Sequence, residues 1–159
     1  MYNMKMKYLC LSNTTKRAKV DNEDYPLLSR FCWFYDPKWN RAYTTIMTKN
    51  VSLSRFIMPP HGAKLEVDHM NRDGLDNRKS NLRICTRIEN EMNKTVRKNT
   101  ASGFKGVTWN HKNNTWRARL KKDGKFLHLG LFKNKKDAAK AYNEKAKEIY
   151  GGFAWLNPV

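Results

Sequence analysis

The chain has 159 residues, a mass of 18.8 kDa and 40% hydrophobic residues, which is enough for one ordinary domain or two small ones with modest cores. Its formal net charge is +18 and its sequence pI is near 10.0, so a polyanion is the expected partner, with nucleic acid ahead of an anionic membrane surface. No apolar run approaches the roughly 18 residues that cross a bilayer, and the basic N-terminus lacks the apolar core of a secretory signal. We therefore expect an intracellular protein that binds nucleic acid and no membrane.

The three cysteines, Cys10, Cys32 and Cys85, lie far apart and never at the CxxC spacing. That spacing argues against a structural zinc site. We expect the cysteines to be small, buried apolar residues.

Residues 17–58 alternate between strand-like and turn-like segments. They predict a short strand, a turn of helix capped by Asp21 or Asn22, and then a β-rich stretch with a hairpin turn at Lys49-Asn50. The aromatic run that contains Phe31 and Trp33 could stack on bases, but burial preferences favour a packed core. This part is predicted to form the platform for the segment that follows.

The segment 66–94, EVDHMNRDGLDNRKSNLRICTRIENEMNK, gathers acids, amides and one histidine in a very basic chain. It reads as a strand ending near His69, a turn-rich loop, a short strand from Asn81, and a helix. Thr86 and Glu89 have the spacing of a capping box, which predicts that the helix starts there with Asn90 in its first turns.

This order of elements can bring four side chains to one point. Asp68 and Asn90 offer hard oxygen atoms that suit Mg²⁺ better than zinc, and His69 could take a proton from water, with the Asn81 amide beside it. Asp68 and His69 can serve one site only if the strand ends or distorts there, because adjacent strand residues point to opposite faces. The alternative stays open that these acids and amides only form turns.

The stretch VDHMNRDGLDNRKSNLRICTRIEN resembles the core motif of HNH endonucleases of the intron and phage homing type. The resemblance implies an N-terminal ββα-metal nuclease module in which His69 is the general base and Asn81 orients it. It also implies that Asp68 and Asn90 bind one Mg²⁺ or Mn²⁺ ion per active site. Residues 17–58 resemble the region before this motif, except that Ser54 stands where relatives often have histidine.

The polar segment 95–102 is predicted to be a linker between domains at 1–94 and 103–159. Residues 95–159 carry 15 Lys and Arg against 4 Asp and Glu, so most of the net charge lies there. Apolar and basic residues alternate from Trp116 to Lys121, Asp123-Gly124 predicts a hairpin turn, and helical spacing follows up to Gly151. These patterns predict a small antiparallel sheet with a helix on its apolar face and cations on the other face.

Residues 102–157 resemble the plant APETALA/ethylene-response-factor DNA-binding domain, through Lys105-Gly106-Val107, Trp116, Leu129-Gly130, Ala141-Tyr142 and Leu156-Asn157 among others. The resemblance implies a three-stranded sheet packed on one helix that reads the major groove. The contact positions it implies are Lys105, Thr108, Asn110, Arg119, Lys121 and His128, to which strand alternation adds Arg117. Thr108, Phe126 and His128 depart from the plant pattern, so the plant recognition sequence is not expected here.

Together these features predict an α+β, site-directed DNA endonuclease that binds double-stranded DNA in the cytoplasm of a bacterial or phage-infected host. We expect a monomer, with a dimer as the alternative. Two rival functions remain: a sequence-specific DNA-binding regulator with an inactive nuclease fold, and a protein that coats RNA or DNA and is supported by charge alone.

Overall fold

The computed structural model describes residues 6–96 and 99–159, and their contacts divide the chain into two units, Met1–Asn90 and Glu91–Val159. The predicted domains at 1–94 and 103–159 and the linker at 95–102 stay predictions, since residues 1–5 and 97–98 lie outside the described residues. Small sheets and few helices occur in both units, so the predicted α+β class is confirmed.

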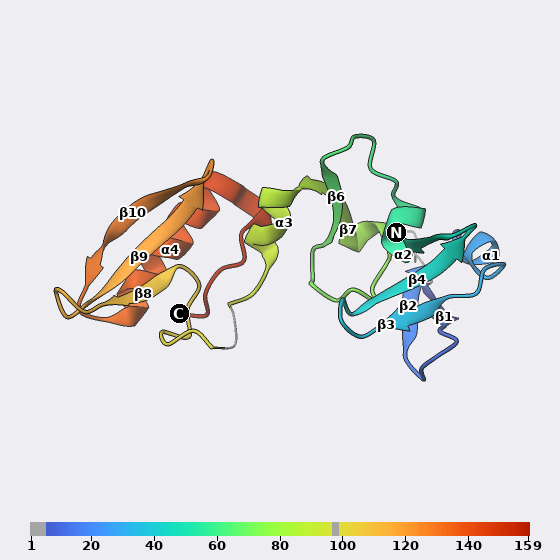
Figure 1. The fold of residues 1–159 in the computed structure, drawn as a ribbon, viewed down its shortest axis with the longest axis horizontal. Coiled ribbons are helices and arrows are strands. Elements are labelled where there is room, and N and C mark those ends of the chain that lie inside the picture. The colour runs from blue at the N-terminus through green and yellow to red at the C-terminus, as the bar shows by residue number, and fades with distance from the viewer. Residues whose placement is uncertain (1–5, 97–98) are drawn as a thin grey trace, which may run out of the picture. The chain divides into compact units, whose positions relative to one another are not determined.

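The first unit starts with a two-stranded antiparallel sheet of β1 (Met6–Cys10) and β2 (Arg17–Asp21). A three-stranded sheet of β3 (Phe34–Asp36), β4 (Arg41–Ile46) and β5 (Lys49–Ser52) follows it. Two short helices, α1 (Tyr25–Leu28) and α2 (Leu53–Ile57), lie before and after that sheet in the chain (Figure 1).

The aromatic run contributes to the core of this unit. Trp33 is only 2% exposed and packs edge-on against Phe31 and Phe56, with ring centroids 6.3 and 5.6 Å away. Its indole N–H donates to the Leu28 carbonyl at 2.8 Å, which satisfies the one polar atom that this burial would otherwise strand. For Trp33 the core role predicted from the sequence is therefore confirmed.

Three local predictions for this region were wrong. The β4–β5 turn lies at Met47-Thr48, because Ile46 pairs with Lys49 and puts Lys49-Asn50 inside β5. The N-cap position of α1 is Asp24, whose side chain makes no capping hydrogen bond, while Asp21 accepts a hydrogen bond from the Lys79 backbone. The cysteines were expected to be buried, but only Cys85 is. Cys10 and Cys32 are exposed, since these two lie at strand or loop positions that face solvent.

The segment 66–94 folds in the predicted order of strand, loop, strand and helix. Antiparallel β6 (Leu65–His69) and β7 (Leu82–Thr86) are followed directly by α3 (Arg87–Asn93). The capping box is present: Thr86 N–H donates to Glu89 Oε2 at 2.7 Å, and Glu89 N–H donates back to Thr86 Oγ1 at 3.3 Å.

The loop 70–81 between β6 and β7, which ends in the 3₁₀ turn Lys79–Asn81, is fastened to β2. Lys19 N–H donates to the Leu75 carbonyl at 2.7 Å, and Asn77 N–H donates to the Lys19 carbonyl at 2.8 Å. Gly74 also packs so closely on the β3–β4 turn that an added Cβ would lie 2.0 Å from the Asn40 carbonyl oxygen. The loop thus has a defined path across the first unit.

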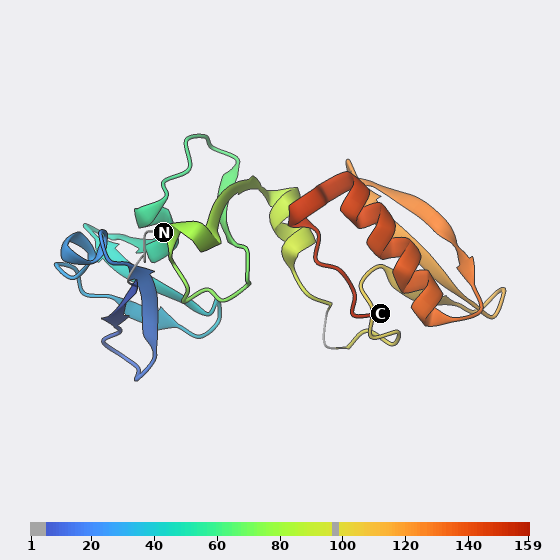
Figure 2. The ribbon, with the colours of Figure 1, turned by 180° about the vertical axis from the view of Figure 1, so that it is seen from behind.

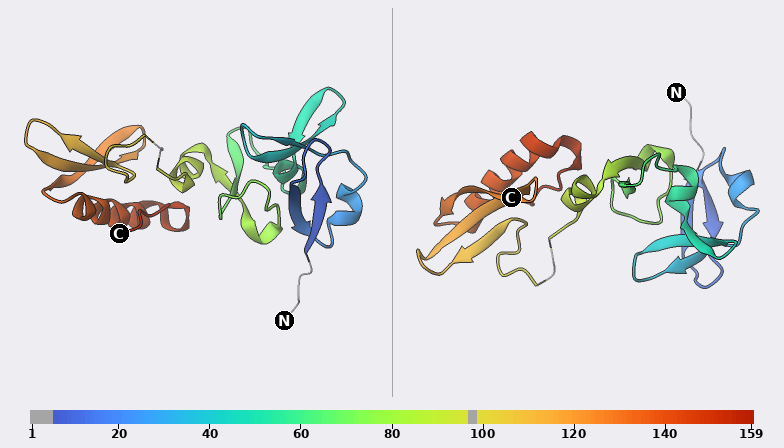
Figure 3. Two further views of the ribbon diagram at one scale, coloured as in Figure 1. Left: turned by 90° about the horizontal axis from the view of Figure 1, so that it is seen from below. Right: turned by 45° about the horizontal axis from the view of Figure 1, so that its top comes forward.

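The second unit is a three-stranded antiparallel sheet in the order β10-β9-β8, from Lys125–Phe132, Thr115–Lys122 and Val107–Asn110. The helix α4 (Lys135–Tyr150) lies along one face of it (Figures 2 and 3), and a short 3₁₀ turn, Gly151–Phe153, follows. The hairpin turn falls at Asp123-Gly124, as predicted, and both residues have positive φ angles of 49° and 80°.

The α4 helix covers the apolar face of the sheet. Ala118 and Leu120 of β9 are 0% and 2% exposed and pack with the buried Ala138, Tyr142 and Ala146. The buried Asn157 side chain bonds to the backbone of Lys105, accepting from its N–H at 2.6 Å and donating to its carbonyl at 3.1 Å. The chain end is thereby held against the start of the sheet.

Candidate active site

Asp68 and His69 occupy the end of β6, where they are 4% and 3% exposed. In the β6–β7 ladder Asp68 pairs with Arg83, and His69, the last residue of β6, pairs with Leu82, the first of β7. The strand ends at His69, so the backbone is released there from the regular alternation that would keep the two side chains on opposite faces.

The His69 ring is held by a buried amide of the loop. His69 Nε2 lies 3.1 Å from Asn77 Oδ1, and Asn77 Nδ2 donates to the Gly74 carbonyl at 3.3 Å. Burial lowers the pKa of His69 below its usual value of 6.5, and this outweighs the hydrogen bond between the ring and the Asn77 amide oxygen, which raises the pKa. The imidazole is therefore neutral at pH 7.

Asn81 ties the same loop together. Its Nδ2 donates to the Asp76 carbonyl at 2.7 Å and to Asn71 Oδ1 at 2.9 Å, while its Oδ1 accepts from Asn71 N–H at 3.0 Å. These bonds fix the backbone on both sides of Asn77. The role of orienting His69, which the sequence assigned to Asn81, stays a prediction; the structure brings Asn77 into contact with the ring.

Asp76 strengthens this loop from inside. It is 1% exposed and receives two hydrogen bonds from the Arg78 guanidinium, at 2.7 and 2.6 Å. The bonds from Arg78 are the main cause that lowers the pKa of Asp76, so the carboxylate stays charged and buried.

Asp68 forms an ion pair across the ladder. Arg83 Nε and Nη2 both donate to Asp68 Oδ2, at 2.9 and 2.7 Å, and the Arg83 side chain is only 16% exposed. Because the two residues face each other on paired strands, the strand register alone brings them together.

Asn90 of α3 reaches the same hairpin through Glu66, since its Nδ2 donates to Glu66 Oε2. Glu66 precedes Asp68 by two residues, so both carboxylates project from one face of β6. Glu66, Asp68 and Asn90 together offer carboxylate and amide oxygens, the hard donors that Mg²⁺ and Mn²⁺ prefer. Among the described residues no group of three His, Cys, Asp or Glu residues forms a complete metal cluster, so water or phosphate oxygens would have to complete the coordination.

One known protein family matches the segment that carries this site. The HNH endonuclease family pattern matches residues 60–92, which contain Asp68, His69, Asn81 and Asn90. The chain is 30% identical over 147 residues to an uncharacterized HNH endonuclease, L560, of Acanthamoeba polyphaga mimivirus, covering 89% of this chain and 75% of the relative. This chain belongs to the HNH endonuclease family.

A second relative is protein 3.8 of Escherichia phage T7, which is 28% identical over 88 residues, or 55% of this chain and 72% of the phage protein. No solved structure matches the chain. The mimivirus match is long enough to include residues of both units, so the likeness is not confined to the HNH segment.

Ser54 stands where the family resemblance implies a histidine, so its surroundings show what this position does in the fold. Ser54 is 1% exposed at the start of α2, and its Oγ lies 3.4 Å from Oγ of the helix cap Ser52. In this HNH-family protein the position is a packed core site.

Sequence reasoning missed three residues of the site: Glu66, Asn77 and Arg83. A signal existed for two of them. Strand alternation puts Glu66 on the same face of β6 as Asp68, and pairing of the two strands predicted there puts Arg83 opposite Asp68. Asn77 gave no distinct signal, since its turn-rich surroundings are typical of any loop.

The second unit of this HNH-family protein places most of the predicted DNA contacts on one face of its sheet, opposite α4. Val107 pairs with Ala118 on the helix side, so the neighbouring pair Thr108 and Arg117 faces away from α4. By the same alternation and register, the face contains Thr108, Asn110, Arg117, Arg119, Lys121 and His128.

This face contains polar atoms without protein partners in the described part of the chain. The buried atoms Thr108 Oγ1 and Arg117 Nε lack a hydrogen bond there. The Arg119 guanidinium lies 4.2 Å from the centroid of the Phe126 ring, which supports an extended arginine side chain. The face therefore gathers cations from β9 around two buried polar atoms that have no partner among the described residues.

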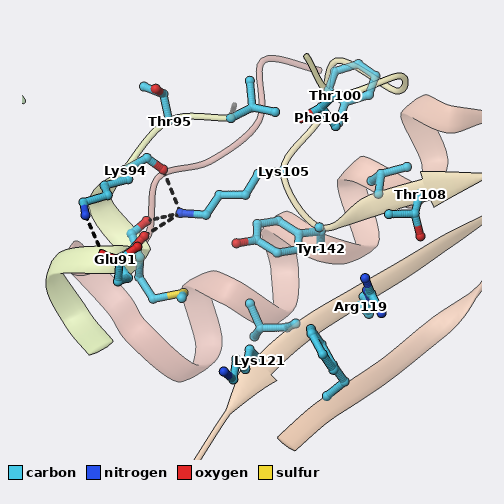
Figure 4. A pocket seen from close by; sticks show the side chains of 16 residues that line it. Glu91, Lys94, Thr95, Thr100, Phe104, Lys105, Thr108, Arg119, Lys121 and Tyr142 are labelled. Atoms are coloured by element: carbon cyan, nitrogen blue, oxygen red, sulfur yellow. Dashed lines mark hydrogen bonds and ion pairs between the residues drawn. The ribbon is translucent and has the colours of Figure 1, made fainter. Parts of the chain in front are cut away.

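Lys105 differs from the other predicted DNA contacts. Its Nζ donates to the carbonyls of Glu91, Met92 and Lys94, at 2.9, 2.8 and 2.7 Å, at the end of α3 (Figure 4). It lines a cavity of about 630 Å³ beside Tyr142. Burial lowers the pKa of Lys105 to about 8, so the ammonium is charged at pH 7 and all three of its N–H donors are used. Its DNA-binding role stays a prediction, and phosphate contact would require these bonds to break.

No helix in the described ranges is long and apolar enough to cross a membrane.

Lys105→Met should destabilise the second unit, because three carbonyls at a helix end lose a charged donor. We expect the free energy of unfolding to fall by about 1.5–3 kcal/mol, measured by calorimetry at pH 7. Lys133→Met, at an exposed position of the same unit, is the matched control and should change stability little. Equal effects of the two substitutions would contradict the role of Lys105 at the helix end.

Proposed function

We propose that the protein is a site-directed DNA endonuclease of the homing type that hydrolyses a phosphodiester bond with His69 as general base. The observation that carries the proposal is a buried imidazole at the end of β6, held by a loop that is itself fastened to β2. A fixed, neutral histidine is what removal of a proton from an attacking water requires.

In this mechanism the reacting groups have separate tasks. His69 takes a proton from water as the water oxygen attacks phosphorus, and the bond from phosphorus to the 3′ oxygen breaks. Asp68 and Asn90 would bind one Mg²⁺ or Mn²⁺ ion, with Glu66 adjacent to both. When bound, the ion supplies charge stabilisation to the phosphate oxygens and to the leaving 3′ oxygen. Asn81 keeps the loop that carries Asn77 in place.

We propose that the second unit docks the nuclease on double-stranded DNA through the sheet face opposite α4, as the APETALA/ethylene-response-factor resemblance implies. Cations on that face, with Arg119 and Lys121 on β9 among them, would contact phosphates. With one candidate centre per chain, a monomer would nick one strand. A DNA-associated location inside a phage-infected bacterial cell agrees with the phage origin of one relative, while the other relative comes from a mimivirus.

A DNA-binding regulator with an inactive nuclease fold is the second candidate. The ion pair between Arg83 and Asp68 favours it, because the guanidinium occupies one carboxylate oxygen that a metal ion would use. The two candidates differ in one measurable property, which is metal-dependent cleavage.

His69→Ala should reduce cleavage of supercoiled DNA by about 10²–10⁴-fold while leaving DNA binding nearly unchanged, since the substitution removes the base and no DNA-binding charge. The substrate is plasmid or phage DNA, incubated with Mg²⁺, with Mn²⁺ or with a chelator. The matched control is His61→Ala, at an exposed histidine of the same unit, which should cleave like the wild type.

Relaxed circles or discrete fragments from the wild type, dependent on added metal, would support the nuclease and show whether one strand or two is cut. Salt-sensitive binding without cleavage by any of the three proteins would support the regulator instead.

Arg119→Ala should relax sequence specificity by about 1–3 kcal/mol if Arg119 reads a guanine, and far less if it contacts only phosphate. The measurement is binding to specific and non-specific duplexes over a range of salt concentrations, where each phosphate contact adds about −0.9 to the slope of log K against log salt. Lys136→Ala, at an exposed position on α4, is the control. If both substitutions lower affinity equally for all sequences, the sheet face does not read bases.

A further inference from the structure

Asn77 lies between two groups whose hydrogen-bonding capacities differ. Its side chain is 1% exposed, with Oδ1 at 3.1 Å from His69 Nε2 and Nδ2 at 3.3 Å from the Gly74 carbonyl oxygen. A carbonyl can only accept a hydrogen bond, whereas a neutral imidazole nitrogen either donates or accepts, depending on where the ring carries its proton.

The Gly74 carbonyl fixes which way the amide faces. Only the NH₂ group of Asn77 can bond to that carbonyl, so the amide oxygen must face His69. The reversed amide would put two oxygen atoms in contact on one side and leave a buried NH₂ group facing the ring. The orientation of the Asn77 amide is therefore set by the backbone of its own loop.

The backbone around Asn77 leaves this amide little freedom. Asn77 N–H donates to the Lys19 carbonyl of β2 at 2.8 Å, and the Asp76 carbonyl accepts from Asn81 Nδ2 at 2.7 Å. Both bonds involve main-chain atoms of residues 76 and 77, so a substitution of the Asn77 side chain leaves them possible. The effect of such a substitution should fall on His69 more than on the path of the loop.

We infer that Asn77 is the positioning residue that fixes the tautomer of His69: its amide oxygen accepts from Nε2–H, so Nδ1 carries the lone pair that receives the proton. The inference rests on the proposed function for the step in which the proton is taken, but the tautomer itself does not depend on cleavage. Asn77 touches neither DNA nor a reacting atom in this role, and it acts through the ring.

The tautomer is measured first, on the wild-type full chain with ¹⁵N-labelled histidine. Long-range ¹H–¹⁵N correlation spectra at pH 8 distinguish a protonated ring nitrogen from an unprotonated one, and His69→Ala identifies the signals of His69. We expect Nε2 to be protonated and Nδ1 to be unprotonated. A neutral ring protonated on Nδ1 would overturn the inference, whether or not the protein cuts DNA.

Two substitutions then test whether Asn77 is the cause. Asn77→Leu keeps a similar volume but removes the acceptor of the Nε2–H bond, so the Nε2-protonated tautomer of His69 should lose population to the Nδ1-protonated one. Asn77→Asp keeps an oxygen atom towards Nε2–H but sets its second oxygen against the Gly74 carbonyl, so the wild-type tautomer should return in a less stable protein. The matched control is Asn113→Leu at an exposed position of the second unit, which should leave the His69 spectrum unchanged. An unchanged tautomer in Asn77→Leu would overturn the inference.

Single-turnover cleavage links the tautomer to the reaction. We expect Asn77→Leu to lower the rate of the cleavage step by about 10²-fold with DNA affinity unchanged, because the base is no longer held in one productive form. Asn77→Asp should recover most of that rate. If the wild type shows the expected tautomer but no cleavage, the proposed function fails while the assignment of Asn77 stands.

Discussion

The pairing of the loop 70–81 with β2 is the constraint on which the candidate active site depends. Two backbone hydrogen bonds, from Lys19 to Leu75 and from Asn77 to Lys19, hold a segment that has little regular structure of its own. Loops of this length are usually mobile, and a catalytic histidine needs the opposite. The first unit supplies rigidity by binding the loop to an existing strand, by packing Gly74 on the Asn40 carbonyl, and by burying Asp76 against Arg78.

The same constraint explains why so many amides lie in this segment. A loop that is buried in part must satisfy its backbone groups there without a sheet or a helix, and amide side chains can both donate and accept. Asn71, Asn77 and Asn81 perform this task through bonds to one another, to the Gly74 and Asp76 carbonyls and to the His69 ring. Turn formation and contact with the histidine therefore go together in this segment, because the turn is what positions the His69 ring.

Features with local causes could be predicted from the sequence. The Thr86 and Glu89 capping box, the Asp123-Gly124 turn and the alternating faces of β9 each depend on residues close together in the chain. The turn at Met47-Thr48 could not be predicted, since Met47 adopts a φ of 55° that its residue type disfavours and the strand pairing imposes. The contact of Asn77 with His69 and that of Lys105 with the end of α3 were beyond prediction for another reason, because each depends on how a loop packs against a distant element.

The ion pair between Asp68 and Arg83 limits how a metal ion could bind. A guanidinium is always charged at physiological pH, so a divalent cation at Asp68 must share the carboxylate with it or displace it. If the metal ion displaced Arg83 from Asp68, the guanidinium would remain on a side chain that is only 16% exposed. Such a change costs several kcal/mol unless another anion replaces Asp68 beside the guanidinium. A DNA phosphate is such an anion, since arginine binds phosphate in the same two-pronged geometry that it uses for a carboxylate. If a metal ion binds at Asp68, a DNA phosphate beside Arg83 would favour that binding, because the phosphate supplies negative charge to the guanidinium in place of the shared carboxylate.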